Sequence, residues 1–400
     1  MDPRLNPYAP GAGTPPPELA GRDELIERAA IALDRIRAGR PARSFLLYGL
    51  RGVGKTVLLN RIRIDAEARG IASVRIEAPE DRSLPALLAP ALRATLLRLS
   101  RGEAAKAAAK KALQALAGFA KALKFKYQDV EVALDIEPQR GLADSGDLDN
   151  DLSDLLSAVG EAATEQGTAV VIFIDELQYV PEEQLAALIS ALHSASQEQL
   201  PVTVVGAGLP QLVGQSGRAK SYAERLFEFA PIDRLDGDSA REALTVPAGR
   251  QHVSYDEDAI AEVLRQTRGY PYFLQEWGKH CWDVADDSPI EREDARLATR
   301  QALAELDASF FRVRFDRLTP AEKRYMRAMA ELGPGPHRSG DIAEVLGKKV
   351  TGVAPIRNAL IAKGMVYSPA HGDTAFTVPL FDGFMKRIMP DGPRAGLGDP

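Results

Sequence analysis

One glycine-rich segment carries residues whose types and spacing suit the binding of a phosphate chain. Residues 49–56 read GLRGVGKT and fit the pattern G-x4-G-K-S/T. Its glycines let the backbone wrap around phosphate oxygens with N–H groups pointing inward, and the following helix adds the partial positive charge of its N-terminus. Lys55 supplies a mobile charge for the β- and γ-phosphates, and Thr56 offers a hydroxyl to Mg²⁺. The predicted nucleotide-binding residues of this loop are Gly49, Gly52, Val53, Gly54, Lys55, Thr56 and Val57.

A pair of acids at the end of an apolar run supplies the second half of this chemistry. Residues 170–176 read VVIFIDE, which indicates an inner strand of a parallel sheet. Asp175 is placed to hold Mg²⁺ together with Thr56. Glu176 can polarise an attacking water, which favours ATP hydrolysis over nucleotide storage or transfer to another substrate; its alternative role is a carboxylate at a helix entry. We therefore predict a slow, regulatory ATPase with Lys55 and Glu176 as catalytic residues and with ATP and Mg²⁺ as cofactors.

Alternating strands and helices are needed to position these residues. A short apolar strand at 45–48 precedes the loop and a helix follows it, and a further strand at 201–206 comes after a helix at 182–196. This alternation predicts an α/β fold with a parallel sheet. Strand signals vanish beyond Arg234, and 238–309 reads as consecutive helices. A helical domain is therefore expected to follow the sheet domain.

Two oppositely charged stretches interrupt the alternation. Residues 93–126 hold nine basic residues and one acid, whereas residues 127–165 hold eleven acids and one arginine. The basic stretch should be helical, because Ala, Leu and Lys favour helices and an apolar face beginning at Leu113 and Leu116 repeats every three or four residues. We interpret the whole as a solvated insert whose charges offset each other. The alternative is a helix that binds nucleic acid or a membrane surface.

The C-terminal region combines three helix signals with a strand-loop-strand signal. A capping box at 319–322 starts one helix, two more helices are expected within 339–364, and strand signals at 365–367 and 374–378 flank a short loop. This order predicts a winged helix-turn-helix, whose third helix enters the DNA major groove while the hairpin touches the backbone. The alternative is a domain for protein contacts or for locking the ATPase closed. The DNA-binding candidates are Lys348, Lys349, Thr351, Arg357, Asn358, Lys363 and His371.

The net charge of −6, from 50 basic and 56 acidic residues, hides a division along the chain. Residues 310–390 hold 13 basic and seven acidic residues, or +6, which leaves −12 on the rest. This basic region supports double-stranded DNA as a partner despite the acidic mean. The longest apolar run, 169–174, has six residues against the ~20 that span a bilayer, and the single Cys281 has no internal disulfide partner. We therefore expect a cytoplasmic protein without a membrane span.

Six motifs, taken in order, resemble those of AAA+ ATPases related to archaeal origin-recognition initiators, a group that overlaps with STAND signalling ATPases. The motifs are GRDE (21–24), GLRGVGKT (49–56), VVIFIDE (170–176), VVGAGLPQL (204–212), YAERLFEF (222–229) and TRGYPYFLQ (267–275). The resemblance covers about residues 6–390. The expected domains are an extended proline-rich arm (1–20), an AAA+ ATPase domain (21–232) with the charged insert (93–165), a helical lid (233–309), a winged helix (310–390) and a flexible tail (391–400).

The resemblance also implies roles for residues outside the phosphate loop. Arg225 would be an arginine finger that reaches a neighbouring subunit's γ-phosphate, which implies self-association; its alternative is a surface or salt-bridge residue. The family often places a polar sensor where this chain has 206–208, Gly-Ala-Gly. Two functions stay open: a DNA-binding switch or motor, and a STAND-type signalling ATPase whose winged helix mediates autoinhibition or assembly. The other residues implied near the nucleotide are, for adenine, Asn6, Tyr8 and Arg22 and, for the lid, Arg268 and Pro271.

Overall fold

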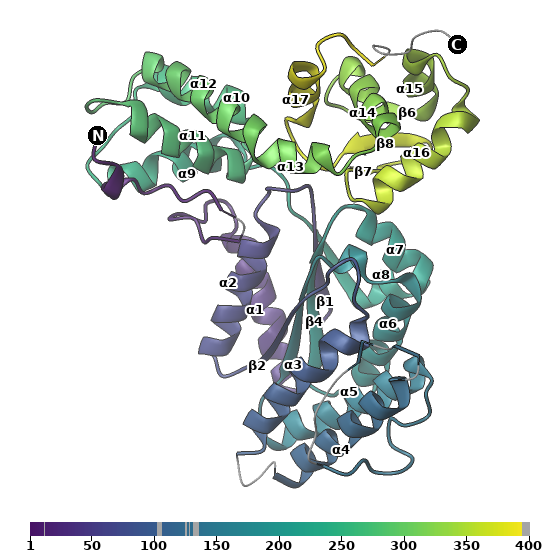
Figure 1. Ribbon diagram of the computed structural model, residues 1–400. Coiled ribbons are helices and arrows are strands. Elements are labelled where there is room, and N and C mark those ends of the chain that lie inside the picture. Colours follow the sequence, from purple (N-terminus) through teal and green to yellow (C-terminus); the bar gives the residue numbers. More distant parts are fainter. Residues whose placement is uncertain (12, 102–105, 125, 128, 131–135, 394–400) are drawn as a thin grey trace. The chain divides into compact units, whose positions relative to one another are not determined.

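The computed structural model describes residues 1–11, 13–101, 106–124, 126–127, 129–130 and 136–393. The chain forms two compact units. The α/β unit consists of Arg22–Gly49 and Lys55–Pro231, and the helical unit consists of Met1–Gly21, Leu50–Gly54 and Ile232–Pro400. Figure 1 shows the elements of both units, coloured along the chain.

The α/β unit is built on a sheet of five strands, all of them parallel. Its strands are β1 (Ser44–Tyr48), β2 (Ala72–Glu77), β3 (Val170–Asp175), β4 (Val202–Gly208) and β5 (Phe227–Pro231), in the order β2-β3-β4-β1-β5. All of β4, and all of β3 except Asp175, is buried, because both strands have neighbours on either side and helices pack against the sheet. The predicted parallel α/β fold with apolar inner strands is confirmed.

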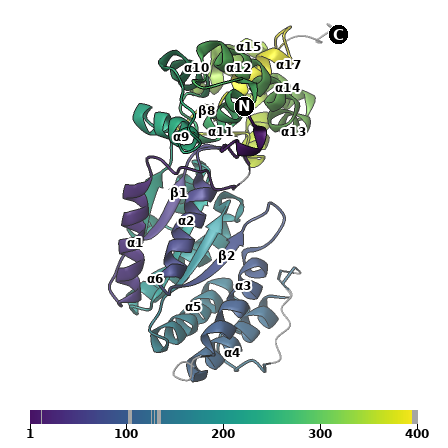
Figure 2. The same cartoon turned by 90° about the vertical axis from the view of Figure 1, so that its left-hand side faces the viewer.

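The helices of the α/β unit surround this sheet. They are α1 (Asp23–Arg37), α2 (Lys55–Ala68), α3 (Leu84–Leu99), α4 (Lys106–Leu123), α5 (Leu148–Glu165), α6 (Glu182–Gln197), α7 (Gln211–Ala219) and α8 (Ala223–Leu226), with a 3-10 turn, η2 (Leu177–Tyr179). Helix α3 packs on β2, and α4 packs on α3 and α5; these three helices are seen together in Figure 2.

The basic stretch is more than a solvated insert. Leu113, Leu116 and Phe119 of α4 are fully or almost fully buried in the main hydrophobic core of the α/β unit. Only the lysine side of α4 faces solvent, and Lys111 Nζ lies 2.7 Å from Glu161 Oε2 on α5, so part of the positive charge is offset as expected. The interpretation of the stretch as merely solvated is therefore wrong for its apolar face, because that face packs against α3 and α5 in the core of the α/β unit. Residues 131–135 of the acidic stretch lie outside the described part of the chain.

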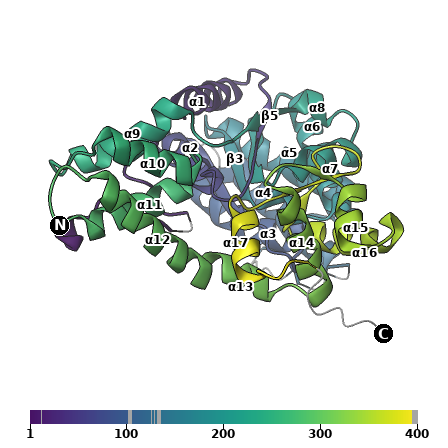
Figure 3. The same cartoon turned by 90° about the horizontal axis from the view of Figure 1, so that it is seen from above.

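The helical unit contains two groups of helices. The first holds α9 (Gly237–Gly249), α10 (Glu257–Thr267), α11 (Pro271–Val284) and α12 (Arg292–Ala308), and α13 (Phe310–Asp316) connects it to a second group of α14 (Pro320–Leu332), α15 (Ser339–Leu346), α16 (Val350–Ala362) and α17 (Phe381–Ile388). Figure 3 shows the two groups on either side of α13. In the first group the described residues make an isolated bridge, Tyr255 to Ile290, and no strand, as the sequence predicts.

A small antiparallel sheet accompanies the second group. Its strands are β6 (His337–Arg338), β7 (Val366–Tyr367) and β8 (Asp373–Phe376), in the order β6-β8-β7. The predicted hairpin is present as β7 and β8, whereas β6 is too short to leave a sequence signal. The predicted capping box is confirmed, because the Thr319 N–H donates to Glu322 Oε2 at 2.7 Å and the Glu322 N–H donates to Thr319 Oγ1 at 3.3 Å.

The proline-rich arm packs on the first helical group. It contains a short 3-10 turn, η1 (Pro3–Leu5), rather than a wholly extended chain. Trp282 Nε1 donates to the Asp2 carbonyl at 2.9 Å, and the Tyr8 ring is so close to α11 that a Cβ on Gly278 would lie 2.6 Å from it. Gly278 is therefore required for the arm to dock. Across the described residues, the helices are all too short or too polar to cross a bilayer.

Candidate nucleotide-binding site

The glycine-rich loop runs from the end of β1 to the start of α2, as the motif requires. Gly52 and Gly54 have φ angles of 79° and 91°, a region that side chains rarely adopt, which explains glycine at both positions. Lys55, the first residue of α2, is buried and its Nζ donates to the Gly49 carbonyl at 3.0 Å. The cation is therefore held at the mouth of the loop, beside the helix N-terminus that favours an anion.

Thr56 and Asp175 meet although 119 residues separate them. Thr56 Oγ1 donates to Asp175 Oδ2 at 2.6 Å, at the carboxyl end of β3. Burial raises the pKa of the Asp175 carboxyl, since desolvation outweighs the hydrogen bonds from Thr56 and from the Glu176 N–H. A hydroxyl and a desolvated carboxylate side by side are oxygen donors of the kind that Mg²⁺ prefers, and the charge of such an ion would compensate the burial of Asp175.

Glu176 is held in an unusual backbone conformation directly after Asp175. Its φ and ψ of 53° and 35° lie in the left-handed region, which is costly for a residue with a side chain and is found most often at functional sites. Its N–H donates to Asp175 Oδ1 at 2.9 Å. The chain therefore turns sharply at the end of β3, and the predicted roles of Asp175 as a metal ligand and of Glu176 as a water-activating base stay predictions.

Gln178 is a site residue that the sequence does not single out. It is buried, its Nε2 donates to Glu176 Oε2, and its Oε1 accepts the Leu209 N–H at 2.9 Å. The amide therefore ties the Glu176 carboxylate to the end of β4. The sequence offers only a weak signal for this role, a polar residue two positions after the acid pair.

The glycines at the end of β4 have a packing reason. A Cβ on Gly206 would lie 2.7 Å from Leu46 Cδ2 and 2.8 Å from Leu177 Cδ2, and one on Gly208 would lie 2.7 Å from Gln178 Oε1. A side chain cannot enter this space without displacing its neighbours. A polar side chain of the kind that the family often places here therefore has no room, because Leu46, Leu177 and Gln178 fill the space beside these glycines.

The residues implied by the family resemblance lie on several elements. In the α/β unit, Arg22 precedes α1 and is half-buried, and Arg225 is exposed on α8. In the helical unit, Arg268 ends α10 in a left-handed conformation, and Pro271 is the first residue of α11. Their contacts with a nucleotide, and the action of Arg225 on a neighbouring subunit, stay predictions.

Asn6 and Tyr8 have structural partners within the helical unit. Asn6 Nδ2 donates to the Lys279 carbonyl at 3.0 Å and to Asp283 Oδ1 at 2.8 Å. The Tyr8 hydroxyl donates to the Leu244 carbonyl and lies 2.9 Å from the Tyr255 hydroxyl, in the core. Both residues therefore anchor the arm to the helices, and their approach to adenine stays a prediction.

The DNA-binding candidates divide into two kinds. Arg357 is engaged within the fold, because it donates to Thr374 Oγ1 at 2.8 Å and to the Asp373 carbonyl at 2.8 Å, which fastens α16 to β8. Lys363 is similarly engaged, with Nζ 2.7 Å from Glu322 Oε2. The candidates whose side chains are exposed are Lys348, Lys349, Thr351, Asn358 and His371.

Comparison with known families and proteins agrees with this geometry. Residues 18–205 match the AAA ATPase domain family, and residues 308–385 match a domain of unknown function (DUF8462). An uncharacterized HTH-type transcriptional regulator of Methanocaldococcus jannaschii is 22% identical over 214 residues, 52% of each chain. An ORC1-type DNA replication protein of Haloarcula marismortui is 22% identical over 322 residues, 78% of this chain and 70% of that protein. The chain thus spans about half the length of the first relative.

A solved structure shares the fold over nearly the whole chain. The Walker-type ATPase of Pyrococcus abyssi has a TM-score of 0.61 at 15% identity and covers 96% of this chain and 99% of its own. At this identity the likeness is one of fold. Together with the loop and the Thr56 and Asp175 pair, this likeness of fold agrees with the match of residues 18–205 to the AAA ATPase domain family.

Proposed function

We propose that the chain hydrolyses ATP and uses the state of the nucleotide to control DNA binding by its C-terminal region. The observation that carries the ATPase part is the meeting of Thr56, Asp175 and Glu176 at the end of β3, in a chain that also has the phosphate-loop motif. Mg²⁺, when bound, supplies charge neutralisation for the phosphates, and Thr56 and Asp175 would hold it. Lys55 would bind the β- and γ-phosphates.

Glu176 is the proposed general base. Its carboxylate accepts a proton from the attacking water, while the amide of Gln178 keeps one of its oxygens in a set direction. The hydrogen bond from the Leu209 N–H to Gln178 Oε1 connects this base to the end of β4, so loss of the γ-phosphate can change the position of Leu209. This path is the proposed replacement for the polar sensor.

Two variants of the full chain test the ATPase part. Lys55→Ala should abolish nucleotide binding in a fluorescent-nucleotide titration, because the loop loses its cation. Glu176→Gln should bind ATP as tightly as the unaltered chain and release no phosphate above background. Unchanged phosphate release by Glu176→Gln would remove it as the base.

The DNA-binding part is supported by the second helical group. Helices α14 to α16 and strands β6 to β8 follow one another in the order of a winged helix, with α16 as the proposed groove helix. Lys348 and Lys349 are exposed immediately before α16, and His371 is exposed between β7 and β8. The two curated relatives are named for transcriptional regulation and DNA replication, which supports duplex DNA as the partner.

A salt titration of the full Glu176→Gln chain with ATP tests this part. The logarithm of the association constant for a fluorescent duplex should fall linearly with the logarithm of salt concentration. Lys348→Ala and Lys349→Ala should each lower that slope by about 1. Lys386→Ala removes an equal charge from an exposed position of α17 and should leave the slope unchanged. Absence of duplex binding at low salt would contradict the proposal.

A second function, a STAND-type switch that the C-terminal region holds shut, is favoured by one contact. Within the helical unit, the Arg51 N–H donates to the Thr377 carbonyl at 2.8 Å. The Thr377 side chain is itself fixed, since Oγ1 donates to the Gly364 carbonyl at 2.6 Å. A backbone N–H of the phosphate loop is thus taken by the C-terminal region. Hydrogen exchange should speed up around residues 364–377 when a non-hydrolysable ATP analogue binds; unchanged exchange there would contradict this switch.

A further inference from the structure

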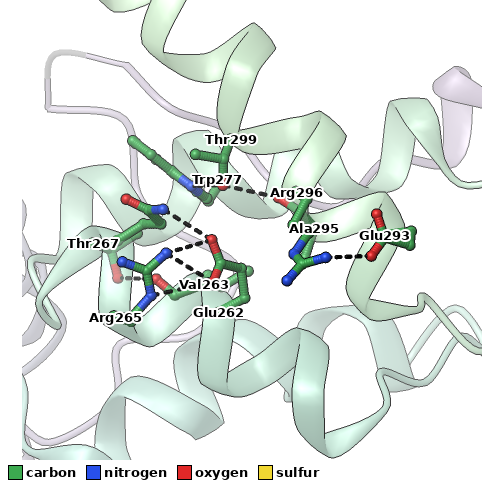
Figure 4. Close-up of polar contacts among 10 residues, drawn as sticks. Glu262, Val263, Arg265, Thr267, Trp277, Glu293, Ala295, Arg296 and Thr299 are labelled. Carbon is green, nitrogen blue, oxygen red and sulfur yellow. Dashed lines mark hydrogen bonds and ion pairs between the residues drawn. The ribbon is translucent and has the colours of Figure 1, made fainter.

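Helices α11 and α12 pack on each other in the helical unit. Trp277, fully buried on α11, donates from Nε1 to Thr299 Oγ1 on α12 at 2.9 Å. The Thr299 hydroxyl donates in turn to the Ala295 carbonyl at 2.9 Å, which is seen in Figure 4. This hydrogen bond and the packing of the two helices bring side chains of α11 and α12 next to each other.

Three metal-ligating side chains gather on this pair. Glu276 and His280 stand one turn apart on α11, and Glu305 reaches them from α12. Their ligand atoms all lie within 4.8 Å of one another. Glu276 and His280 are each 6% exposed, whereas Glu305 lies at the surface. The spacing i, i+4 places both α11 ligands on one face of the helix.

Two buried atoms of this cluster lack a hydrogen bond. Among the described residues, Glu276 Oε2 and His280 Nε2 have no hydrogen-bond partner. His280 Nε2 lies 3.2 Å from Glu305 Oε2, but the pair does not have hydrogen-bond geometry. An unsatisfied buried polar atom destabilises the folded state, so two of them at one place point to a missing ligand.

We propose that Glu276, His280 and Glu305 form a binding site for Zn²⁺ or a similar first-row divalent metal ion. An imidazole nitrogen combined with carboxylate oxygens suits these ions better than Mg²⁺ or Ca²⁺, which prefer oxygen ligands alone. Three protein ligands leave one position of a tetrahedral site open. The exposed Glu305 is the ligand that can adjust its rotamer to bring the oxygens to bonding distance.

Two neighbouring side chains affect metal binding at this site: Tyr272 favours it and Lys279 competes with it. The Tyr272 hydroxyl donates to Glu276 Oε1 at 2.7 Å and so orients that carboxylate, as outer partners of metal ligands do. Lys279 Nζ lies 3.2 Å from Glu305 Oε1 and competes for the same carboxylate. The metal must therefore displace Lys279, which makes this lysine a useful probe of the site.

Tyr272 connects the proposed metal site with the phosphate loop. Tyr272 carries the outer hydrogen bond to Glu276, and its own N–H donates to the Gly52 carbonyl at 3.1 Å within the helical unit. A metal ion at Glu276 would hold the first turns of α11, and with them Tyr272, in place against the loop. The site itself does not depend on the proposed ATPase, since its residues and its test involve no nucleotide.

Zinc binding to the full metal-free chain tests the proposal. Isothermal titration with Zn²⁺, without nucleotide, should show one saturable site, and the Co²⁺-loaded chain should show the visible absorption of a low-coordinate site. His280→Gln should weaken Zn²⁺ binding at least ~100-fold, because it removes a direct ligand. Loss of an outer partner alone typically lowers metal affinity by about 10- to 100-fold. His252→Asn, at an exposed turn in the same unit, should leave Zn²⁺ binding unchanged.

Two surface variants keep the test decisive if His280→Gln fails to fold. Glu305→Gln should weaken Zn²⁺, whereas Lys279→Ala should strengthen it severalfold by removing the competing ammonium. If Glu276, His280 and Glu305 form only a cluster of ionisable side chains, the chain should show no saturable Zn²⁺ binding. Either that result or equal affinity in Glu305→Gln, Lys279→Ala and the unaltered chain would overturn the proposal.

Discussion

Gln178 holds Glu176 through a hydrogen bond from its side-chain amide to the Glu176 carboxylate. The same side chain accepts the Leu209 N–H at 2.9 Å, so the direction of the proposed base is set from β4. Gln178→Ala should therefore lower the rate of ATP hydrolysis by up to about 100-fold, because a misdirected base is a positioning defect. ATP affinity should stay unchanged, since Gln178 lies outside the phosphate loop.

Turnover and nucleotide affinity need to be measured together on this variant. Gln178→Glu is the companion variant, because it places a second carboxylate beside Glu176 and should be at least as slow. Gln215→Ala, which removes only a 3.2 Å bond to the Gln178 carbonyl, is the matched control and should hydrolyse ATP normally. A parallel loss of affinity in Gln178→Ala would show that it acts on binding instead.

The parts of this site that the sequence predicts are those encoded locally. The phosphate loop needs only a strand, its glycines and a helix start, and the apolar run before Asp175 identifies an inner strand. Gln178 escapes prediction because its importance depends on Leu209, which only the parallel pairing of β3 and β4 brings near. The buried face of α4 is missed for the same reason, since charge dominates its sequence while its packing depends on distant helices.

In the C-terminal region, too, the sequence predicts the elements but not the contacts of single residues. Helices, capping box and hairpin follow from periodicity and turn signals, and they are present in the structure. The sequence does not separate Lys349, which is exposed, from Arg357, which is engaged, because both are basic residues close to or in one helix. The difference arises from β8 lying within reach of Arg357.

A polar side chain introduced near the end of β4 should destabilise the α/β unit. Gly206→Asn would introduce a Cβ 2.7 Å from Leu46 Cδ2, and overpacking of this kind costs about 1–3 kcal/mol of the free energy of unfolding. Urea unfolding measures this cost. Gly217→Ala is the control, because its Cβ meets nothing within 4 Å on α7, and should stabilise the chain by up to about 1 kcal/mol. Equal free energies of unfolding for the two variants would show that the side chains around Gly206 can move to make room for the new side chain.

Substitutions at Arg357 and Lys349 should have different effects, the first on stability and the second on DNA binding. Arg357→Ala removes the hydrogen bonds to Thr374 and Asp373 and should lower the free energy of unfolding of the C-terminal region by about 1–3 kcal/mol. Lys349→Ala should leave stability unchanged and weaken duplex DNA. Thermal unfolding and fluorescence anisotropy measure the two effects. If Lys349→Ala unfolds earlier while Arg357→Ala does not, the assignment of the two roles is reversed.

The stability of the C-terminal region should depend on pH through Glu322. Burial alone would raise the pKa of the Glu322 carboxyl, but the hydrogen bonds from Lys363 and from Thr319 outweigh it and hold the pKa below its ordinary value of 4.5. The folded state therefore favours the ionised carboxylate. This contribution is fully present above the ordinary pKa and is lost as pH falls through the lower pKa of the folded state.

Glu322→Gln should accordingly lower the free energy of unfolding by about 1–3 kcal/mol at pH 7, because it weakens charge-assisted hydrogen bonds to Lys363 and Thr319. The difference from the unaltered chain should shrink as pH falls below 4.5, measured by urea unfolding across pH 3 to 7. Glu331→Gln removes a half-exposed ion pair with Arg327 on the same helix, and should cost less than about 1 kcal/mol. A loss that stays constant with pH would mean that Glu322 stabilises through packing, since only the ionised carboxylate accepts both bonds at full strength.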